Sequence, residues 1–280
     1  MLKWTLTALV ASVAVLSFSN KDNAQTVDGA SFKVGVTSRH LLPAGSYDWR
    51  GAGMHALLEV VWYPAASDAD AKPQRIPPVG PALFEAAPAA PEAKIAASPA
   101  KFPLILLSHG TGGTAQSLAW FATALASCGY IVAGVNHPGN NAMEPYTVQG
   151  FTLWWLRAKD LSTVLDDMLA DPEFGPHIDR RRLGAAGFSL GGYTMIELAG
   201  GRTSRGHFTE TCKAAPDQVS CKAPPEFPDL LATSKALAAT DPAFAKALGA
   251  AGAYRDSRIA AVFAMAPALG PAFAPVSLKT

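Results

Sequence analysis

The chain has almost no excess of charge of either sign. Of its 280 residues, 23 are Lys or Arg and 22 are Asp or Glu, so the formal net charge is +1. Proteins that bind nucleic acid or an anionic membrane surface usually present concentrated positive charge. The balance therefore argues against both kinds of partner and favours a small, largely uncharged substrate.

Cysteine is also scarce. The chain has three, and none stands in a CxxC or Cys/His spacing, so we expect neither a metal-binding nor a catalytic cysteine. Cys212 and Cys221 lie close together in a polar stretch, where a disulfide would close a loop with little core of its own. We expect that bond, and we expect Cys128 to be a small buried hydrophobe.

The apolar run at the N-terminus is too short to span a bilayer. It extends from Trp4 to Phe18, about fifteen residues against the roughly 20 that a transmembrane helix needs. Lys3 precedes it and polar residues lead to Ala24, so a secretory signal peptide over residues 1–24 is favoured over a retained anchor. We expect a secreted or periplasmic protein with one domain over residues 25–280.

Alternating strands and helices dominate the second half of the chain. Apolar strands are predicted at 104–108, 130–135, 181–188 and 259–266, and helices at 115–127, 157–170 and 190–199. This order predicts a mostly parallel sheet with helices on both faces. Upstream, residues 31–42 and 56–65 predict an antiparallel pair at one sheet edge, while 67–101 and 202–256 are expected to be a surface connection and a loop-rich segment.

A nucleophile motif lies where a strand meets a helix. Residues 187–192 read Gly-Phe-Ser-Leu-Gly-Gly, the pattern G-x-S-x-G, between the strand and helix predicted there. A sharp turn of this kind holds Ser189 at the helix N-terminus, and it needs glycine neighbours because the backbones approach closely. Ser189 is therefore the candidate nucleophile.

A glycine-rich loop follows an earlier strand. Residues 109–113 read His-Gly-Thr-Gly-Gly. Some hydrolases with a G-x-S-x-G motif have an HG-rich loop at this position, and its backbone N–H groups form part of the oxyanion hole. We assign the two oxyanion donors to the backbone N–H groups of Leu190 and Thr111, with Gly112 as the alternative second donor. His109 is expected to have a structural role. His137 either lines the opening of the same active site or only ends its strand.

Four segments carry a family resemblance. Residues 102–110, 129–133, 136–140 and 187–192 resemble the serine esterases related to platelet-activating-factor acetylhydrolases and predicted dienelactone hydrolases, within the α/β-hydrolase superfamily. The resemblance implies an α/β-hydrolase fold, no metal or organic cofactor, and attack on a carboxylic ester through an acyl-enzyme. Dienelactone hydrolases use cysteine as nucleophile, and this chain has Ser189 instead.

The acid and the histidine of a triad have no candidates in the chain. In this fold both follow the nucleophile, in the order Ser, Asp or Glu, His. After Ser189 the histidine is His207, the acid between them is Glu197, and no histidine follows Asp256. We expect an incomplete domain that lacks the last strands, exposes a sheet edge and has little or no activity as written. The alternatives are a non-catalytic binding protein of the same fold and a serine peptidase or amidase.

Overall fold

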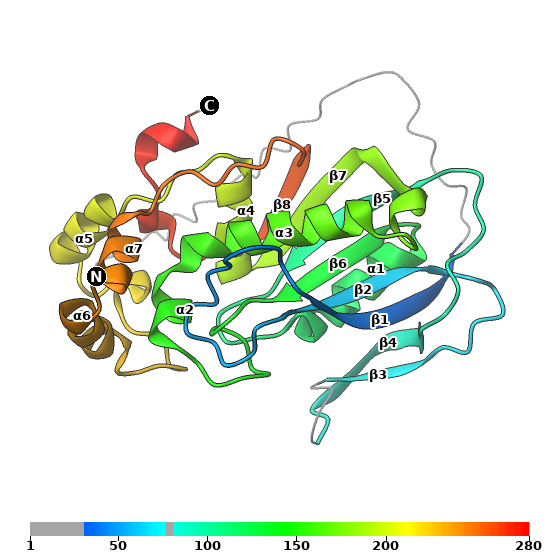
Figure 1. Ribbon diagram of the computed structural model, residues 1–280, viewed down its shortest axis with the longest axis horizontal. Coiled ribbons are helices and arrows are strands. Elements are labelled where there is room, and N and C mark those ends of the chain that lie inside the picture. The colour runs from blue at the N-terminus through cyan, green and yellow to red at the C-terminus, as the bar shows by residue number, and fades with distance from the viewer. Residues whose placement is uncertain (1–30, 77–80, 280) are drawn as a thin grey trace, which may run out of the picture. The chain divides into compact units, whose positions relative to one another are not determined.

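One eight-stranded sheet organises the part of the chain that the structure describes. The computed structural model describes residues 31–76 and 81–279, and the expected signal peptide lies outside them. The strand order is β3-β4-β1-β2-β6-β5-β7-β8, and β6, β5, β7 and β8 run parallel (Figure 1). The strands are β1 Lys33–Leu41, β2 Leu57–Ala65, β3 Lys72–Ile76, β4 Phe84–Pro91, β5 Phe102–Ser108, β6 Ile131–Asn136, β7 Ile178–Phe188 and β8 Ala261–Met265.

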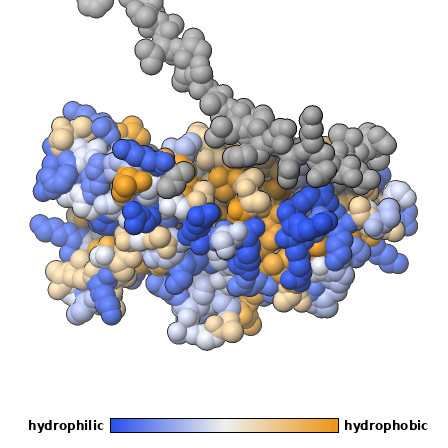
Figure 2. All heavy atoms as spheres, turned by 90° about the horizontal axis from the view of Figure 1, so that it is seen from above, coloured by the Kyte–Doolittle hydropathy of each residue, from blue (hydrophilic) through white to orange (hydrophobic). Residues whose placement is uncertain are grey.

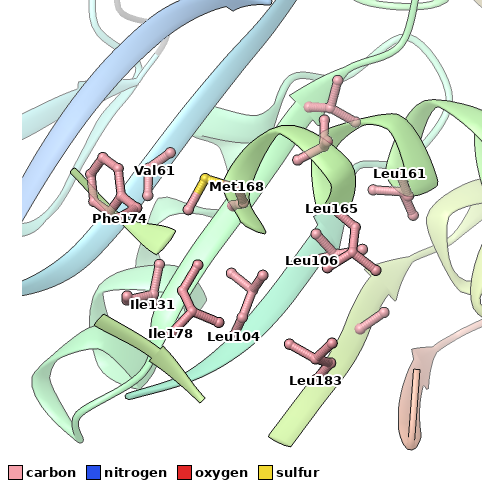
Figure 3. Packing of buried hydrophobic residues seen from close by; sticks show 14 of the residues in the cluster. Val61, Leu104, Leu106, Ile131, Leu161, Leu165, Met168, Phe174, Ile178 and Leu183 are labelled. Carbon is pink, nitrogen blue, oxygen red and sulfur yellow. The ribbon is translucent and has the colours of Figure 1, made fainter. Parts of the chain in front are cut away.

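Helices cover both faces of this sheet, as the sequence predicted. They are α1 Ala119–Ser127, α2 Val148–Thr152, α3 Arg157–Ala170, α4 Leu190–Ala199, α5 Arg205–Ala214, α6 Leu230–Thr240 and α7 Pro242–Gly249. On one face, α3 and α4 pack into a single apolar cluster with the parallel strands (Figure 3). On the other face, α1 packs its small residues against Trp62 and Val132. The result is the α/β-hydrolase type of fold.

The predicted stripe on α3 forms the centre of the first cluster. Leu161, Val164, Leu165 and Met168 recur at helical spacing, and each is completely buried. They face Leu104 and Leu106 of β5, which lies next to β7, the strand that Ser189 follows (Figure 3). This packing holds α3 against the central parallel strands.

Two expectations about the first half of the chain were partly wrong. β1 and β2 do pair antiparallel, but they lie inside the sheet and not at its edge. The stretch 67–101 is not a plain surface connection, because it contains β3 and β4, and these strands extend the sheet beyond β1. Its alanines and prolines hide the strands from a periodicity test, since few large apolar residues mark an inner face.

The segment between α4 and β8 is helical where we expected loops. It forms α5, α6 and α7, which lie together at one end of the structure in Figure 1. The expected disulfide between Cys212 and Cys221 is present, with 5.4 Å between the Cα atoms. Cys128, by contrast, is exposed, so the prediction of a buried residue was wrong. It caps the C-terminus of α1, where the helix turns away from the core.

β8 is the terminal strand of the sheet in the described residues. It pairs with β7 on one side, and Phe263 on this strand is 56% exposed. Figure 2 shows one face of the molecule, on which hydrophobic residues lie between hydrophilic ones. Within the described ranges, no helix combines the length and the apolar character that crossing a membrane requires.

Candidate active site

Ser189 occupies a sharp turn between β7 and α4. Its φ of 54° and ψ of −114° lie in a region that L-residues seldom adopt, so the backbone there is strained. The end of β8 holds it in place: the Ser189 N–H donates to the carbonyl of Met265, and the Ser189 carbonyl accepts from Ala268. The half-buried side chain makes no hydrogen bond within the described residues.

Close backbone contacts explain the glycines of the motif. A Cβ on Gly191 would lie 2.0 Å from the carbonyl oxygen of Ser108, and one on Gly187 would lie 2.4 Å from that of Gly191. A Cβ on Gly192 would lie 2.9 Å from the carbonyl oxygen of Met265. The turn therefore forms only where three positions have no side chain.

The glycine-rich loop lies beside Ser189. A Cβ on Gly110 would lie 3.3 Å from Cβ of Ser189, so the loop runs along the serine. The N–H of Gly112 donates to Oδ1 of Asn140 at 2.7 Å, which rules out Gly112 as the alternative oxyanion donor. The N–H groups of Thr111 and Leu190 have no acceptor in the described part of the chain. Two free donors thus remain, one on the residue that follows Ser189 and one on the residue that follows Gly110, whose position lies against the serine.

The segment that contains α5, α6 and α7 contacts the same glycine-rich loop. A Cβ on Gly112 would lie 3.3 Å from Cγ of Glu226, and the hydroxyl of Tyr146 donates to the Gly112 carbonyl at 3.1 Å. Phe227 also packs edge-on against Phe151 of α2, with 5.5 Å between ring centroids. The connection between the disulfide and α6 therefore lies against the loop that contains Thr111.

A buried hydrogen-bonded chain lies behind this loop. Nδ1 of His137 is 2.7 Å from Oδ2 of Asp160, and its Nε2 is 2.9 Å from Oγ of Ser108. All three residues are buried. Since the carboxylate accepts from Nδ1, the Ser108 hydroxyl donates to Nε2. His137 is thus an interior residue. Of the two alternatives that the sequence left open, it ends its strand and does not line the opening of the active site.

Asp160 also binds residues from the N-terminal part of the domain. Nη2 of Arg50 donates to both of its oxygens, at 2.8 and 2.7 Å, and the hydroxyl of Tyr47 donates to Oδ1. Arg50 is 2% exposed, so this ion pair is removed from solvent. Burial raises the pKa of Tyr47, and the charge of Asp160 adds to that effect, which keeps the phenol neutral.

His109 connects the hydrogen-bonded chain of His137 and Asp160 to the glycine-rich loop. It is completely buried; its Nε2 accepts the backbone N–H of His137 at 3.2 Å, and its Nδ1 is 2.6 Å from the Gly110 carbonyl. Burial, followed by the positive charge of Arg157, holds the pKa of His109 and of His137 well below the usual range. Both imidazoles are neutral, and His109 has the structural role that we expected.

Four residues of this network were not predicted from the sequence: Arg50, Tyr47, Asp160 and Arg157. A signal was present for two of them, because Arg157 and Asp160 lie on the same helical stripe as Leu161 and Val164. Charged residues on a buried stripe need partners in the interior. Arg50 and Tyr47 gave no such signal, since the polar stretch around them reads as an ordinary loop.

The residues considered for a triad lie elsewhere. Glu197 is buried with Tyr193 and Thr203 and binds both. His207 is exposed on α5, and Asp256 binds Arg258 and Ser162. Within the described ranges, no carboxylate or imidazole makes a hydrogen bond to Ser189.

Parts of the chain are similar to known proteins. The family model of platelet-activating factor acetylhydrolase, isoform II, matches residues 84–152, which contain the glycine-rich loop and end before Ser189. Lipase 1 of Moraxella sp. (strain TA144) is 35% identical over 91 residues, 32% of this chain and 25% of that protein, so the match spans a quarter of that relative. A ferulic acid esterase from Streptomyces cinnamoneus is similar in structure, at 28% identity over 60% of this chain and 55% of that chain, with a TM-score of 0.46.

Proposed function

We propose, from the premise that this chain belongs to the α/β-hydrolase superfamily, that it is a serine-dependent hydrolase of carboxylic esters. One observation carries the proposal above the others. Ser189 stands in a strained turn at a helix N-terminus, with the loop of Gly110 against it and two unused N–H groups beside it. That is the arrangement that acyl transfer requires.

The mechanism follows from these groups. Oγ of Ser189 adds to the ester carbonyl carbon and gives its proton to a general base, and the carbonyl oxygen becomes an oxyanion. The N–H groups of Leu190 and Thr111 stabilise that oxyanion, and the positive end of α4 adds to the effect. The alcohol then leaves with a proton, and water releases the acid from the acyl-enzyme.

We assign no residue of the described part of the chain to the general base. His109 and His137 are completely buried, and both nitrogens of each ring are already occupied. His207, the histidine that follows Ser189, makes no hydrogen bond to it in the described residues. Without a base the serine is a weak nucleophile at neutral pH, so we expect slow acylation and little turnover.

Added imidazole tests the proposal directly, because it can supply the missing base. We expect 4-nitrophenyl acetate to acetylate Ser189, detected by mass spectrometry, and imidazole to accelerate that reaction by about tenfold or more. Ser189→Ala should remove the adduct, while Ser108→Ala, a buried serine of the same network, should retain it. No adduct on Ser189 with or without imidazole would contradict the proposal and favour a binding protein.

The same assay separates ester from amide cleavage. An aminoacyl 4-nitroanilide replaces the ester, and we expect no acylation of Ser189 above the Ser189→Ala background. Faster reaction with the anilide than with the ester would identify an amidase or peptidase instead.

We also propose that the protein is exported. The N-terminal apolar run supports this, and so does the Cys212–Cys221 disulfide, since such bonds persist in oxidising compartments. Expression of the full chain in a bacterium and N-terminal sequencing should give a mature protein that begins near Gln25. A chain that keeps Met1 and remains in the cytoplasm would contradict export.

A further inference from the structure

Arg157 is a buried cation without an anionic partner in the residues that the structure describes. Its side chain begins α3 and is 1% exposed, and neither Nε nor Nη1 has a hydrogen-bond partner there. Its polar contact joins Nη2 to Nδ1 of His109 at 3.1 Å. Burying a guanidinium without acceptors is costly, so its presence calls for a reason.

The tautomer of His109 shows that this contact gives Arg157 no acceptor. Nε2 of His109 accepts the N–H of His137, so the proton of the neutral ring lies on Nδ1. Nδ1 then donates to the Gly110 carbonyl, 2.6 Å away. A protonated Nδ1 has no lone pair for Nη2 of Arg157.

The nearby carboxylate is already occupied. Asp160 accepts two hydrogen bonds from Arg50, one from His137 and one from Tyr47. With both histidines and the phenol neutral, two guanidinium groups share one carboxylate. Asp48, which is exposed and accepts the backbone N–H of Arg50, adds a negative charge on the Arg50 side of the cluster. Arg157 is therefore left without a hydrogen-bonded anion behind the glycine-rich loop, within the residues that the structure describes.

We propose that Arg157 is kept charged at this position because it stabilises the oxyanion that forms when Ser189 attacks an ester. The inference rests on the proposed function. The guanidinium and the Gly110 carbonyl both contact Nδ1 of His109, and Gly110 lies against Ser189 and precedes the donor Thr111. In a water-excluded interior a fixed charge acts over that range without reorganisation. Arg157 touches no substrate, so it is an electrostatic positioning residue.

A substitution that removes the charge and keeps the volume separates this role from a structural one. In Arg157→Met, we expect Ser189 to be acetylated about tenfold more slowly at saturating 4-nitrophenyl acetate with imidazole, at an unchanged half-saturating concentration. We expect the melting temperature to stay equal or rise, because an unpaired buried charge is replaced by an apolar side chain. Arg157→Lys should keep part of the rate.

Arg181→Met is the control, since it removes one positive charge from the distant, amino-terminal part of β7, where the side chain is 91% exposed. It should leave the acetylation rate unchanged. An acetylation rate in Arg157→Met equal to that of the wild type would overturn this inference alone. So would a fall in melting temperature of more than about 3 °C, which would show that Arg157 has a stabilising partner. A wild-type chain that is not acetylated would overturn the proposed function, and this inference with it.

Discussion

His137 donates its Nδ1 proton to Asp160 across 2.7 Å, and both side chains are removed from solvent. This pair joins the strand that precedes the glycine-rich loop to α3, because His137 also accepts from Ser108 and Asp160 also binds Arg50. The carboxylate is therefore the common acceptor of the interior network. Its removal tests how far the fold depends on that network.

Asp160→Ala should destabilise the protein by about 3–5 kcal/mol, because it leaves the Arg50 guanidinium buried without a counter-charge. Urea unfolding monitored by circular dichroism measures the loss. Asp166→Ala is the matched control: Asp166 binds Arg258, but its side chain is 67% exposed, and such a pair contributes about 0–1 kcal/mol. Equal effects of the two substitutions would contradict the buried ion pair.

Gly191→Ala should prevent the nucleophile turn from forming as described. The added Cβ would meet the Ser108 carbonyl oxygen at 2.0 Å, a backbone atom that cannot move aside. We expect a loss of at least about 1–3 kcal/mol in stability, measured by thermal unfolding, together with loss of Ser189 acetylation. Gly206→Ala, on exposed α5 with no atom within 4 Å of the added Cβ, should be neutral or stabilise slightly.

Glu197 should make the protein less stable as the pH rises toward neutral. Burial raises its pKa from 4.5 to about 7, against the opposing effect of hydrogen bonds from Thr203 and Tyr193. The folded state therefore holds a proton that the unfolded state has released between pH 4.5 and 7. This contribution is fully present below pH 4.5 and is lost as the pH rises through 7, a change on the order of 3 kcal/mol.

Urea midpoints between pH 5 and 8 measure this dependence, and Glu197→Gln should reduce the slope. Glu59 acts in the same direction, because burial raises its pKa to about 7 as well, so part of the slope should remain in the variant. A Glu197→Gln protein with the wild-type slope would show that Glu197 is ionised in the fold.

Loss of the Cys212–Cys221 disulfide should destabilise the protein by about 2–3 kcal/mol, the value expected for a short closed loop. The double variant Cys212→Ser/Cys221→Ser should unfold at lower urea concentration than the oxidised wild type, and a reducing agent should not change it further. Cys128→Ser serves as control, because this exposed cysteine is free, and it should match the wild type. No difference between the double variant and the wild type would contradict a stabilising bond.

The order of the elements could be predicted from the sequence wherever large apolar side chains mark the buried face of a strand or helix. The apolar runs of β5, β6 and β7 and the stripe on α3 identified a parallel sheet with helices on both faces, because those elements face the core directly. The mostly polar residues of β3 and the alanines and prolines of β4 reported no burial, so that hairpin was missed. The helices α5 and α6 were missed for a related reason: their surfaces are largely exposed and show no apolar stripe.

The position of Ser189 was determined by the sequence alone, because G-x-S-x-G describes a local backbone turn between a strand and the helix that follows it. The network behind the loop was decided only by the tertiary structure. Arg50, His137 and Asp160 come from distant parts of the chain, and no local pattern shows which carboxylate a buried guanidinium will meet. The unpaired charge of Arg157 could not be predicted for the same reason, because it depends on which donors already occupy the nearby acceptors.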